Sequence, residues 1–329
     1  MSIEQEVVIG WDIGGAHLKA VTLDSQGDIV RCIQLPCPLW QGLQYLEQGV
    51  EQILVGSLAT DHAITMTGEL VDLFANRSEG VIAIAQAITR KLENKQVCFF
   101  AGKKGFVSTN ECKDNIENIA SMNWYATGLF VAGKIQQALV IDIGSTTTDM
   151  MVVSEGKVWT QGNTDFTRMA SNELVYTGLV RTPLMALAQK ISFQGIEVGV
   201  MAEYFATTAD VYRVLGELPQ DADQQPAADN GDKTALASAR RIARMIGRDV
   251  ESASPEEWKN LAQQFADKQF QQLLTACERQ LARGLLASSA PMIGAGCGSL
   301  LAKKIAQKLD RPYLDFSSFA SKKIEYNQI

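Results

Sequence analysis

The sequence predicts an α/β protein made of two similar lobes. Its 329 residues suffice for about two domains of ordinary size. Residues 6–23 read as an apolar strand, a glycine-containing turn and a second, alternating strand, and residues 136–153 repeat this pattern. The tripeptide Asp-Ile-Gly stands at 12–14 and again at 142–144, an offset of 130 residues. We therefore expect each half to open with the same antiparallel hairpin.

Further turns extend each hairpin to a three-stranded meander, at 25–27 in the first half and at 154–156 in the second. Helical and extended segments then alternate in both halves, which indicates an α/β architecture. The first half predicts helices at 39–54, 78–93 and 113–135 and strands at 62–67 and 96–101. The second half predicts a surface loop at 218–233, a strand at 290–293, and helices at 201–216, 234–247, 255–284 and 299–309.

The helix at 255–284 has the clearest start, because Ser254 suits the N-cap and Pro255 the first helical position. From these elements we expect lobes at 1–135 and 136–309, with residues 310–329 packing back on the first lobe.

Composition narrows the classes of function. The net charge of −7 gives no cationic field for nucleic acid. The two histidines exclude a multi-histidine metal site, and the six cysteines form no CxxC pair, which favours a reducing compartment. No stretch reaches the roughly 18 apolar residues of a membrane span, and the first residues do not resemble a signal peptide. We expect a cytoplasmic protein with neither nucleic-acid nor membrane partners.

The first Asp-Ile-Gly turn is a candidate phosphate and metal site. Asp12 ends a strand, and Gly14 and Gly15 allow a tight turn whose backbone amides an anion can approach. A carboxylate repels phosphate, but it can hold Mg²⁺, which in turn bridges to phosphate oxygens. The second turn, residues 142–149, adds the hydroxyls of Ser145, Thr146 and Thr147 and a further carboxylate at Asp149.

These turns can bind a ligand or can be ordinary turns, because a single Asp-x-Gly turn is commonplace without any ligand. Two copies in equivalent strand–turn–strand settings favour the binding function. A third glycine-rich turn, residues 294–298, lies between a strand and a helix, where a helix N-terminus can face an anion or a nucleoside.

In this order, the three turns resemble the phosphate-1, phosphate-2 and adenosine motifs of the actin/hexokinase/Hsp70 superfamily. Within it, residues 141–153 (IDIGSTTTDMMVV) are most similar to the hydantoinase/oxoprolinase branch. Five more stretches resemble proteins of the tetrahydromethanopterin-linked C1-transfer pathway, namely residues 65–70, 123–126, 173–178, 180–183 and 208–212. The resemblance implies a duplicated, two-lobed actin-like (ribonuclease H-like) fold with a ligand cleft between the lobes.

One activity in this group of proteins belongs to methanofuran biosynthesis. It joins a (5-aminomethylfuran-3-yl)methyl diphosphate to the phenol oxygen of γ-glutamyl-tyramine and releases pyrophosphate. The resemblance therefore implies a transferase with a small-molecule diphosphate substrate and a phenolic acceptor, Mg²⁺ as cofactor, and ATP as a possible one. A homodimer is also expected.

The resemblance also suggests roles for individual residues. Asp12 and Asp142 would lie toward the metal. The phosphate- and cofactor-binding set would be Gly14, Gly15, Ala16, His17, Lys19, Gly144, Ser145, Thr146, Thr147, Gly294 and Gly296. Three carboxylates, Glu69, Asp149 and Asp210, are the catalytic candidates, since the phenol needs a general base.

Plainer roles stay open for several of them. Lys19 can face solvent, and His17 can be a neutral side chain packed in the turn. Glu69 can serve a helix start, where the dipole favours a carboxylate. Asp210 can lie on a solvated helix face. Arg181, just before Thr182-Pro183, can bind a substrate carboxylate or form an ordinary surface ion pair.

Two other functions use the same turns. One is an ATP-dependent small-molecule kinase or oxoprolinase/hydantoinase-like hydrolase, with the third turn on the nucleoside. The other is a non-catalytic, nucleotide-gated scaffold, which is disfavoured because no extra substrate-binding domain is recognisable.

Overall fold

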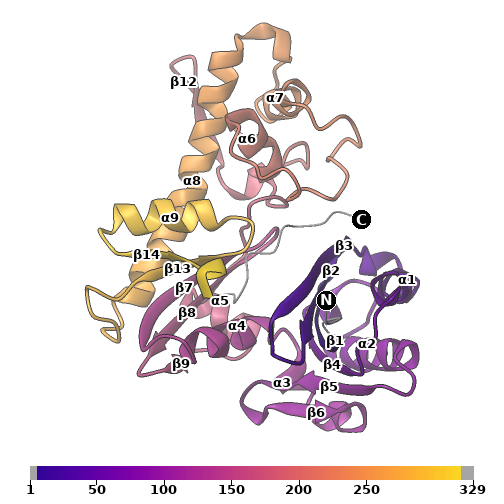
Figure 1. Ribbon diagram of the computed structural model, residues 1–329. Helices are drawn as coiled ribbons and strands as arrows, with labels where there is room; N and C mark the ends of the chain where they lie inside the picture. Colours follow the sequence, from indigo (N-terminus) through magenta and orange to yellow (C-terminus); the bar gives the residue numbers. More distant parts are fainter. Residues whose placement is uncertain (1–5, 320–329) are drawn as a thin grey trace, which may run out of the picture. The chain divides into compact units, whose positions relative to one another are not determined.

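The computed structural model describes residues 6–319, which form two compact units (Figure 1). The first unit comprises the chain up to Val131 together with the residues from Ser317, and the second runs from Ala132 to Phe316. The two units divide at 131/132, and the lobe boundary expected from the sequence is 135/136. The expectation that residues 310–329 pack on the first lobe is wrong for Tyr313–Asp315, which pair with the sheet of the second unit. Residues 317–319 are grouped with the first unit. Residues 320–329 lie outside the described part of the chain.

The first unit is built on a six-stranded sheet of order β3-β2-β1-β4-β5-β6. Strands β1, β2 and β3 form the predicted antiparallel meander, and β4 and β5 continue the sheet in parallel to β1. The bounds are Glu6–Ile13, His17–Asp24 and Ile29–Pro36 for β1 to β3, and Asp61–Met66, Gln96–Phe100 and Phe106–Ser108 for β4 to β6. Because β1 and β4 are parallel, their carboxyl ends meet at one edge of the sheet.

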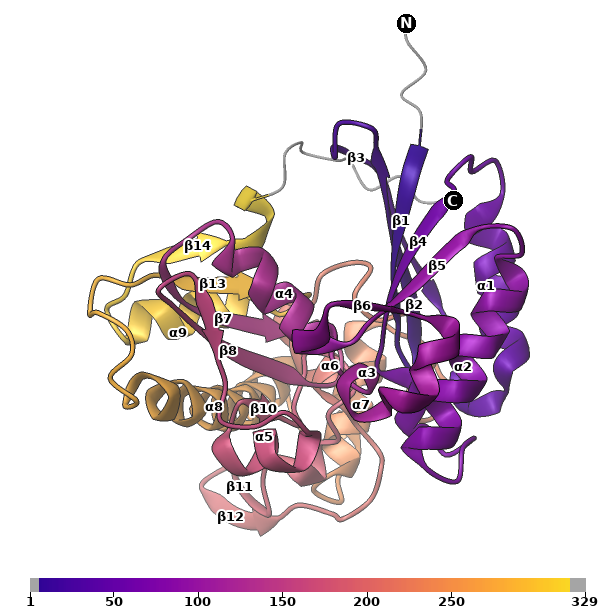
Figure 2. The same ribbon diagram turned by 90° about the horizontal axis from the view of Figure 1, so that it is seen from below.

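Helices α1 and α2 lie beside each other on one side of this sheet (Figure 2). Helix α1, Leu43–Leu54, buries Leu46, Val50 and Ile53 on one face. Helix α2, Arg77–Lys91, begins at Asn76, whose side chain caps the amide of Glu79. Short 3₁₀ turns complete the unit at Leu39–Gln41, Gly68–Leu70, Gly102–Lys104 and Thr109–Asp114.

The single helix expected at 113–135 is wrong, because the segment is broken into α3, Ile116–Ile119, and α4, Asn123–Ala132. Ala120 forms an isolated bridge with Met66 at the end of β4. Ser121 follows with a left-handed φ of 52°. Neither conformation continues a helix, so the chain turns here and α4 starts two residues later.

The second unit repeats this arrangement around a sheet of order β10-β8-β7-β13-β14, with β9 also paired to β8. Strands β7, β8 and β9 are the second predicted meander, and β13 is parallel to β7 as β4 is to β1. The bounds of β7 to β10 are Gln137–Ile143, Thr148–Ser154, Lys157–Trp159 and Leu174–Val175. Those of β13 and β14 are Met292–Ala295 and Tyr313–Asp315, and β11, Lys190–Phe193, pairs with β12, Ile196–Gly199.

The helices of the second unit are α5 to α9, and α8 runs from the sheet to the region of α6 and α7 (Figure 1). Ser254 and Glu257 form a capping box at the start of α8, and Pro255 is its first residue, as predicted. In chain order, the bounds of α5 to α9 are Asp165–Ser171, Thr208–Leu215, Ala235–Arg244, Pro255–Leu281 and Ser299–Lys308. Short 3₁₀ turns lie at Leu184–Ala186, Val250–Ser252 and, near the end of the described chain, Phe316–Phe319.

The helix expected at 201–216 is wrong for residues 201–207, because α6 begins only at Thr208. Thr207 and Asp210 form a capping box there, which fixes the helix start.

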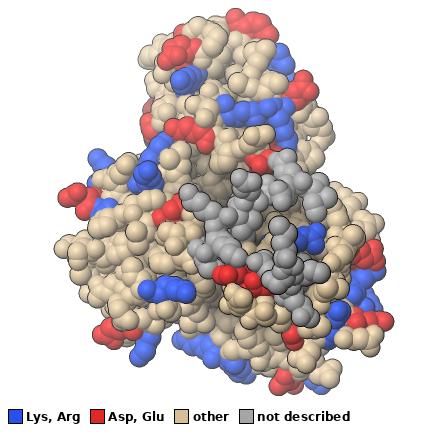
Figure 3. All heavy atoms as spheres, viewed as in Figure 1, with Lys and Arg blue, Asp and Glu red and all other residues tan. Residues whose placement is uncertain are grey.

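Each unit has its own apolar core, formed between its sheet and its helices. On the face shown in Figure 3, positive and negative side chains are interspersed. Among the described residues, no helix is long and apolar enough to cross a membrane.

Candidate functional site

The two Asp-Ile-Gly turns have the same backbone geometry. The Gly14 amide donates to the His17 carbonyl over 3.0 Å, and the Gly144 amide donates to the Thr147 carbonyl over 2.9 Å. In each turn the aspartate lies two residues before that glycine, on the first strand of the hairpin. The internal repeat seen in the sequence is therefore a repeat of hydrogen bonding as well.

The residues opposite the two aspartates differ. Asp12 pairs with Lys19 across β1 and β2, whereas Asp142 pairs with Asp149 across β7 and β8. The first turn thus has a carboxylate beside an ammonium group, and the second has two carboxylates on neighbouring strands.

Asp12 is held by two side chains. The Lys19 Nζ lies 3.0 Å from Asp12 Oδ2, and Asn123 Nδ2 donates to Asp12 Oδ1 over 3.5 Å. The Lys19 side chain is 52% exposed. It therefore faces solvent, one of the two roles expected for it, and it also neutralises Asp12. Asn123 begins α4, so the break in the expected helix brings this amide to the first turn.

The rest of the first turn is packed into the unit. His17 and Ala16 are buried, and the carbonyls of Gly15 and Ala16 accept hydrogen bonds from the amides of Leu39 and Cys37. A Cβ on Gly15 would come within 2.7 Å of the Val71 side chain, so a larger residue there would require Val71 to shift.

Glu69 lies at the same edge of the sheet as Asp12. The Thr67 amide donates to the Ile13 carbonyl over 2.9 Å, which joins the end of β4 to the first turn. Glu69 follows in the 3₁₀ turn and is completely buried, and Ser121 Oγ donates to its Oε1 over 2.7 Å. The structure thus brings two acidic residues of the predicted site, Asp12 and Glu69, to one end of two parallel strands.

The second turn is supported from behind by the segment after β10. The amides of Val180 and Arg181 both donate to the Ser145 carbonyl, over 3.0 and 2.8 Å, and the Leu179 amide donates to the Gly144 carbonyl over 2.9 Å. Gly178 packs on the backbone of Ser145 so closely that a Cβ would lie 2.5 Å from its carbonyl carbon.

A buried polar network holds that segment in place. Gln269 of α8 donates to Thr177 Oγ1 and to the Gly178 carbonyl, both over 2.8 Å, and accepts from the Tyr212 hydroxyl over 2.6 Å. Thr208 also donates to the Gly178 carbonyl, over 2.9 Å. A satisfied network in an apolar core fixes one arrangement, here that of residues 177–181.

The third glycine-rich turn packs on the second. The Gly298 amide donates to the Ile143 carbonyl over 2.9 Å. Gly296 has a left-handed φ of 75°, and a Cβ there would lie 2.5 Å from Asp142 Oδ1. Gly294, in β13, packs against the Tyr313 hydroxyl. In the second unit, the predicted residues of two turns therefore lie together, namely Asp142, Gly144 and Ser145 of the second turn and Gly296 of the third.

Two of the catalytic candidates are engaged in ion pairs. Asp149 Oδ1 accepts from Arg168 Nη1 of α5 over 2.8 Å, and the Arg168 side chain is 1% exposed. Asp210 Oδ1 accepts from Arg241 Nε over 2.8 Å and from Ser238 Oγ over 2.7 Å.

The solvated helix face expected as the plainer role of Asp210 is wrong, because the residue is only 2% exposed. Its second oxygen accepts from the Thr207 amide in the capping box. The spacing Thr-x-x-Asp at 207–210 was the sequence signal of that role.

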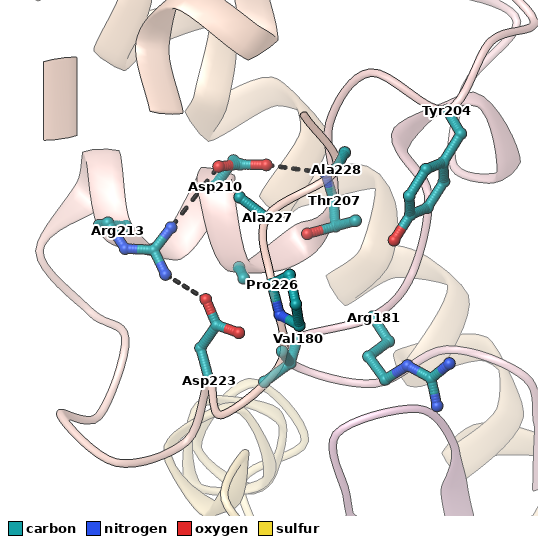
Figure 4. Close-up of a pocket in the computed structure, with 11 residues that line it drawn as sticks. Val180, Arg181, Tyr204, Thr207, Asp210, Arg213, Asp223, Pro226, Ala227 and Ala228 are labelled. Atoms are coloured by element: carbon teal, nitrogen blue, oxygen red, sulfur yellow. Dashed lines mark hydrogen bonds and ion pairs between the residues drawn. The ribbon is translucent and has the colours of Figure 1, made fainter. Parts of the chain in front are cut away.

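A pocket lies beside Asp210 in the second unit (Figure 4). Its walls come from residues 180–181, from the start of α6, and from the loop that follows α6. Arg213 bridges Asp210 and Asp223 on one side of the pocket, and Tyr204 and Arg181 stand on the other. Sequence reasoning named Arg181 but did not predict the pocket.

The donor set can be compared with the needs of Mg²⁺. Within residues 6–319, no three His, Cys, Asp or Glu side chains gather as ligands for a metal ion. Mg²⁺ keeps several waters and is usually bound by one or two carboxylates together with substrate phosphates. Asp142, beside the bare backbone of Gly296, fits that manner of binding. Asp12 fits it less directly, because Lys19 already shares its carboxylate.

Several supporting residues escaped the sequence analysis, namely Asn123, Ser121, Gln269 and Thr177. Asn123 lies in a stretch that resembles the family, but nothing in its local sequence pattern indicates a contact with Asp12. Gln269 was detectable only as a polar residue on the apolar face of a long helix.

Comparisons with known proteins identify the family and support the fold of the chain. The hydantoinase/oxoprolinase family model matches residues 61–320. The chain is 32% identical over 270 residues to the (4-{4-[2-(gamma-L-glutamylamino)ethyl]phenoxymethyl}furan-2-yl)methanamine synthase of Methanocaldococcus jannaschii, which covers 82% of this chain and 78% of that protein. It is 34% identical over 137 residues to the synthase of the same name from Methanococcus vannielii, covering 41% of this chain and 61% of that protein.

Among solved structures, the nucleotide-free acetone carboxylase matches with a TM-score of 0.58 and 12% identity, over 92% of this chain and 67% of that one. This match supports the predicted fold, a duplicated actin-like α/β architecture. The match to the family model covers most of the chain, and the longer of the two curated matches covers a similar share. The chain therefore belongs to the hydantoinase/oxoprolinase family.

Proposed function

We propose that this protein is a transferase of methanofuran biosynthesis, which joins (5-aminomethylfuran-3-yl)methyl diphosphate to the phenol oxygen of γ-glutamyl-tyramine. The observation that carries the proposal is the 32% identity over 82% of the chain to a synthase whose product is an aryl furanylmethyl ether. The duplicated turns support it, because each combines a carboxylate with a glycine-bearing loop, as binding of a diphosphate through a metal ion requires.

The reaction forms one bond and breaks one. The phenol oxygen attacks the CH₂ carbon on the furan ring, and the bond from that carbon to the diphosphate oxygen breaks. The furan ring supports positive charge at this carbon, so the barrier lies largely in the departing diphosphate. Fixed positive charge and hydrogen-bond donors around the leaving group are therefore the main catalytic need.

We assign the turns to that task. Ser145, Thr146 and Thr147 offer hydroxyls to the phosphate oxygens, and the backbone at Gly14, Gly15 and Gly144 permits close approach. Asp12 and Asp142 would hold Mg²⁺, which would neutralise charge on the leaving diphosphate. Lys19, beside Asp12, adds a further cation.

We assign the general base to Glu69. Its carboxylate is shielded from water and oriented by Ser121. Asp149 and Asp210 are each held in an ion pair by a buried arginine, so both carboxylates already have a structural partner. The phenolic proton would pass to Glu69 as the ether bond forms.

The remaining assignments concern the surroundings. We propose a reducing cytoplasmic setting, since all six cysteines are free thiols. We keep a homodimer as an expectation, and ATP as the cofactor of the alternative reading. Gly296 and Gly298 pack on the second turn, and this packing is the observation that favours the alternative. In that alternative the third turn would contact the nucleoside of ATP.

One experiment separates the two readings. The protein is incubated with the furanylmethyl diphosphate, γ-glutamyl-tyramine and Mg²⁺ in the absence of ATP, and pyrophosphate and the ether are quantified. We expect equal amounts of both products. A parallel incubation with Mg-ATP and γ-glutamyl-tyramine alone measures ADP. ADP release that depends on the acceptor, without pyrophosphate release in the first incubation, would replace the transferase with an ATP-dependent enzyme.

A further inference from the structure

Two backbone amides of the second turn point away from the segment that supports the turn. The Gly144 carbonyl accepts a hydrogen bond from the Leu179 amide. The Ser145 carbonyl accepts one from the Arg181 amide. A trans peptide directs its N–H opposite to its C=O, and the described part of the chain contains no cis peptide bond. The amides of Ser145 and Thr146 are therefore directed to the other side of the turn.

These two amides are available to a ligand. Among the residues that the structure describes, neither amide donates a hydrogen bond to a backbone or side-chain group. Ser145 and Thr146 are half-buried, so a ligand can reach the turn from its open side. Successive backbone N–H groups that point the same way bind anions. The second turn thus offers a phosphate group two N–H donors in addition to its hydroxyls.

Gly178 links the supporting segment to the turn. It precedes the residues whose amides hold the turn, and a Cβ on Gly178 would lie 2.5 Å from the Ser145 carbonyl carbon. The Gly178 amide donates to Thr182 Oγ1 over 2.8 Å, and its carbonyl accepts from the Thr208 hydroxyl over 2.9 Å. The position of Gly178 therefore determines where the next amides meet the turn.

Gln269 of helix α8 holds Gly178 from the core. Its Nε2 donates to the Gly178 carbonyl and to Thr177 Oγ1, both over 2.8 Å. Its Oε1 accepts from the Tyr212 hydroxyl over 2.6 Å. The orientation of the side-chain amide is fixed, because the Gly178 carbonyl can only accept a hydrogen bond. Both N–H groups and the oxygen of Gln269 are thus bonded.

The stability of the core alone does not require an amide at this position. Gln269 is 0% exposed, and the same face of α8 buries Phe265 and Leu273. Burial of an amide costs free energy, which its hydrogen bonds largely offset. What a fully bonded amide adds is a single arrangement of the groups that it binds.

We propose that Gln269 is a positioning residue for the diphosphate. Through Gly178 and residues 179–181, it keeps the amides of Ser145 and Thr146 directed at the phosphate oxygens. This role rests on the proposed function, which assigns the second turn to the diphosphate. Gln269 is buried and does not touch the substrate. Its effect is on donors that are fixed in advance, which bind a charged group without a cost of reorganisation.

The test compares two buried glutamines of α8. Gln269→Met removes the hydrogen bonds to Thr177 and Gly178. Gln280→Met is the matched control, because Gln280 is 1% exposed and donates to the Ser171 carbonyl over 2.8 Å, outside the second turn. The affinity of each full-length protein for inorganic pyrophosphate in the presence of Mg²⁺ is measured by calorimetry. The free energy of unfolding is measured in urea.

The two variants should separate binding from stability. Both substitutions leave buried polar groups without partners, so both should destabilise the protein. Only Gln269→Met should weaken pyrophosphate binding, by roughly tenfold or more, because displaced amides lose charge-assisted hydrogen bonds to phosphate. Thr208→Val removes a single hydrogen bond to the Gly178 carbonyl and should weaken pyrophosphate binding by roughly threefold.

Two results would overturn the role of Gln269: wild-type affinity for pyrophosphate in Gln269→Met, or an equal loss of affinity in Gln280→Met. Should Gln269→Met fail to fold, wild-type affinity in Thr208→Val would overturn it instead. Formation of the ether from the two substrates tests the proposed function separately. Ether formation together with wild-type affinity in Gln269→Met would keep the transferase and reject the positioning role. Selective loss of affinity in Gln269→Met without any ether would do the reverse.

Discussion

Gly296 lies directly against the carboxylate of Asp142, so that a Cβ on Gly296 would approach Asp142 Oδ1 to 2.5 Å. The third glycine-rich turn thereby limits the space around the aspartate of the second turn. Its φ of 75° also favours glycine over any other residue. The two motifs are 154 residues apart in the chain, but they form one site in the second unit.

Gly296→Ala should therefore both destabilise the protein and displace Asp142. We expect the free energy of unfolding in urea to fall by about 3 kcal/mol, the sum of backbone strain and the clash, and turnover to be lost. Gly195→Ala is the control, because Gly195 has a φ of 77° with no atom within 4 Å of a Cβ. It should cost about 1 kcal/mol and leave turnover intact. Equal effects of the two substitutions would refute the close packing on Asp142.

Asp149→Asn should act on stability. Arg168 is almost fully buried, and its partner carboxylate is only 17% exposed, so the substitution leaves a buried cation without its counter-charge. We expect a loss of about 3 kcal/mol in the free energy of unfolding. Glu197→Gln breaks a pair with Lys190 in which both side chains are mostly exposed, and it should change little. An Asp149→Asn protein of normal stability but no activity would return Asp149 to a catalytic role.

Glu69→Gln tests the general base. The amide oxygen can still accept from Ser121, so the fold should be retained while the proton acceptor is removed. We expect kcat to fall by roughly 10²- to 10⁴-fold with little change in the KM for the diphosphate. Ser121→Ala, which removes only the orienting hydrogen bond, should reduce kcat far less. A Glu69→Gln protein with wild-type kcat would exclude Glu69 as the base.

His62 gives a pH dependence of stability. Its Nδ1 accepts from Trp11 Nε1 over 3.1 Å, and burial, aided by the nearby Lys95, lowers the pKa of His62 to about 4. The unfolded chain takes up this proton near pH 6.5, so the stabilising contribution is complete above pH 6.5 and is lost as the pH falls toward 4.

Between pH 7 and pH 4.5, the wild type should therefore lose about 2 kcal/mol more unfolding free energy than His62→Gln, in which this titration is absent. Urea unfolding at the two pH values measures the difference. Parallel pH profiles for the two proteins would contradict the neutral, buried histidine.

The sequence predicted the elements with strong local signals. The two meanders and the start of α8 at Ser254 and Pro255 followed from period-two alternation, turn residues and capping. The break before Asn123 could not be predicted, because it depends on the pairing of Ala120 with Met66, a contact across 54 residues. The start of α6 was missed because the apolar residues before Thr208 resemble a helical face.

For the candidate site, too, the sequence identified some residues but not the roles of others. Asp12, Asp142 and the glycines stand out because they are repeated at a fixed offset and lie in turns. The roles of Asp149 and Asp210 depend on Arg168 and Arg241, whose positions are set by packing of distant helices. Sequence patterns identify a carboxylate, but they do not identify the group that binds it.

The most direct test of the account is the affinity for inorganic pyrophosphate, measured by calorimetry with and without Mg²⁺ in the wild type, Asp12→Asn and Asp142→Asn. If the carboxylates act through the metal, the wild type should bind pyrophosphate only with Mg²⁺, and each substitution should weaken that binding by roughly tenfold or more. Removal of a negative charge would instead strengthen the binding of an anion held directly by the protein. Tighter pyrophosphate binding by either variant, or equal binding without Mg²⁺, would contradict the proposed metal-bridged diphosphate site.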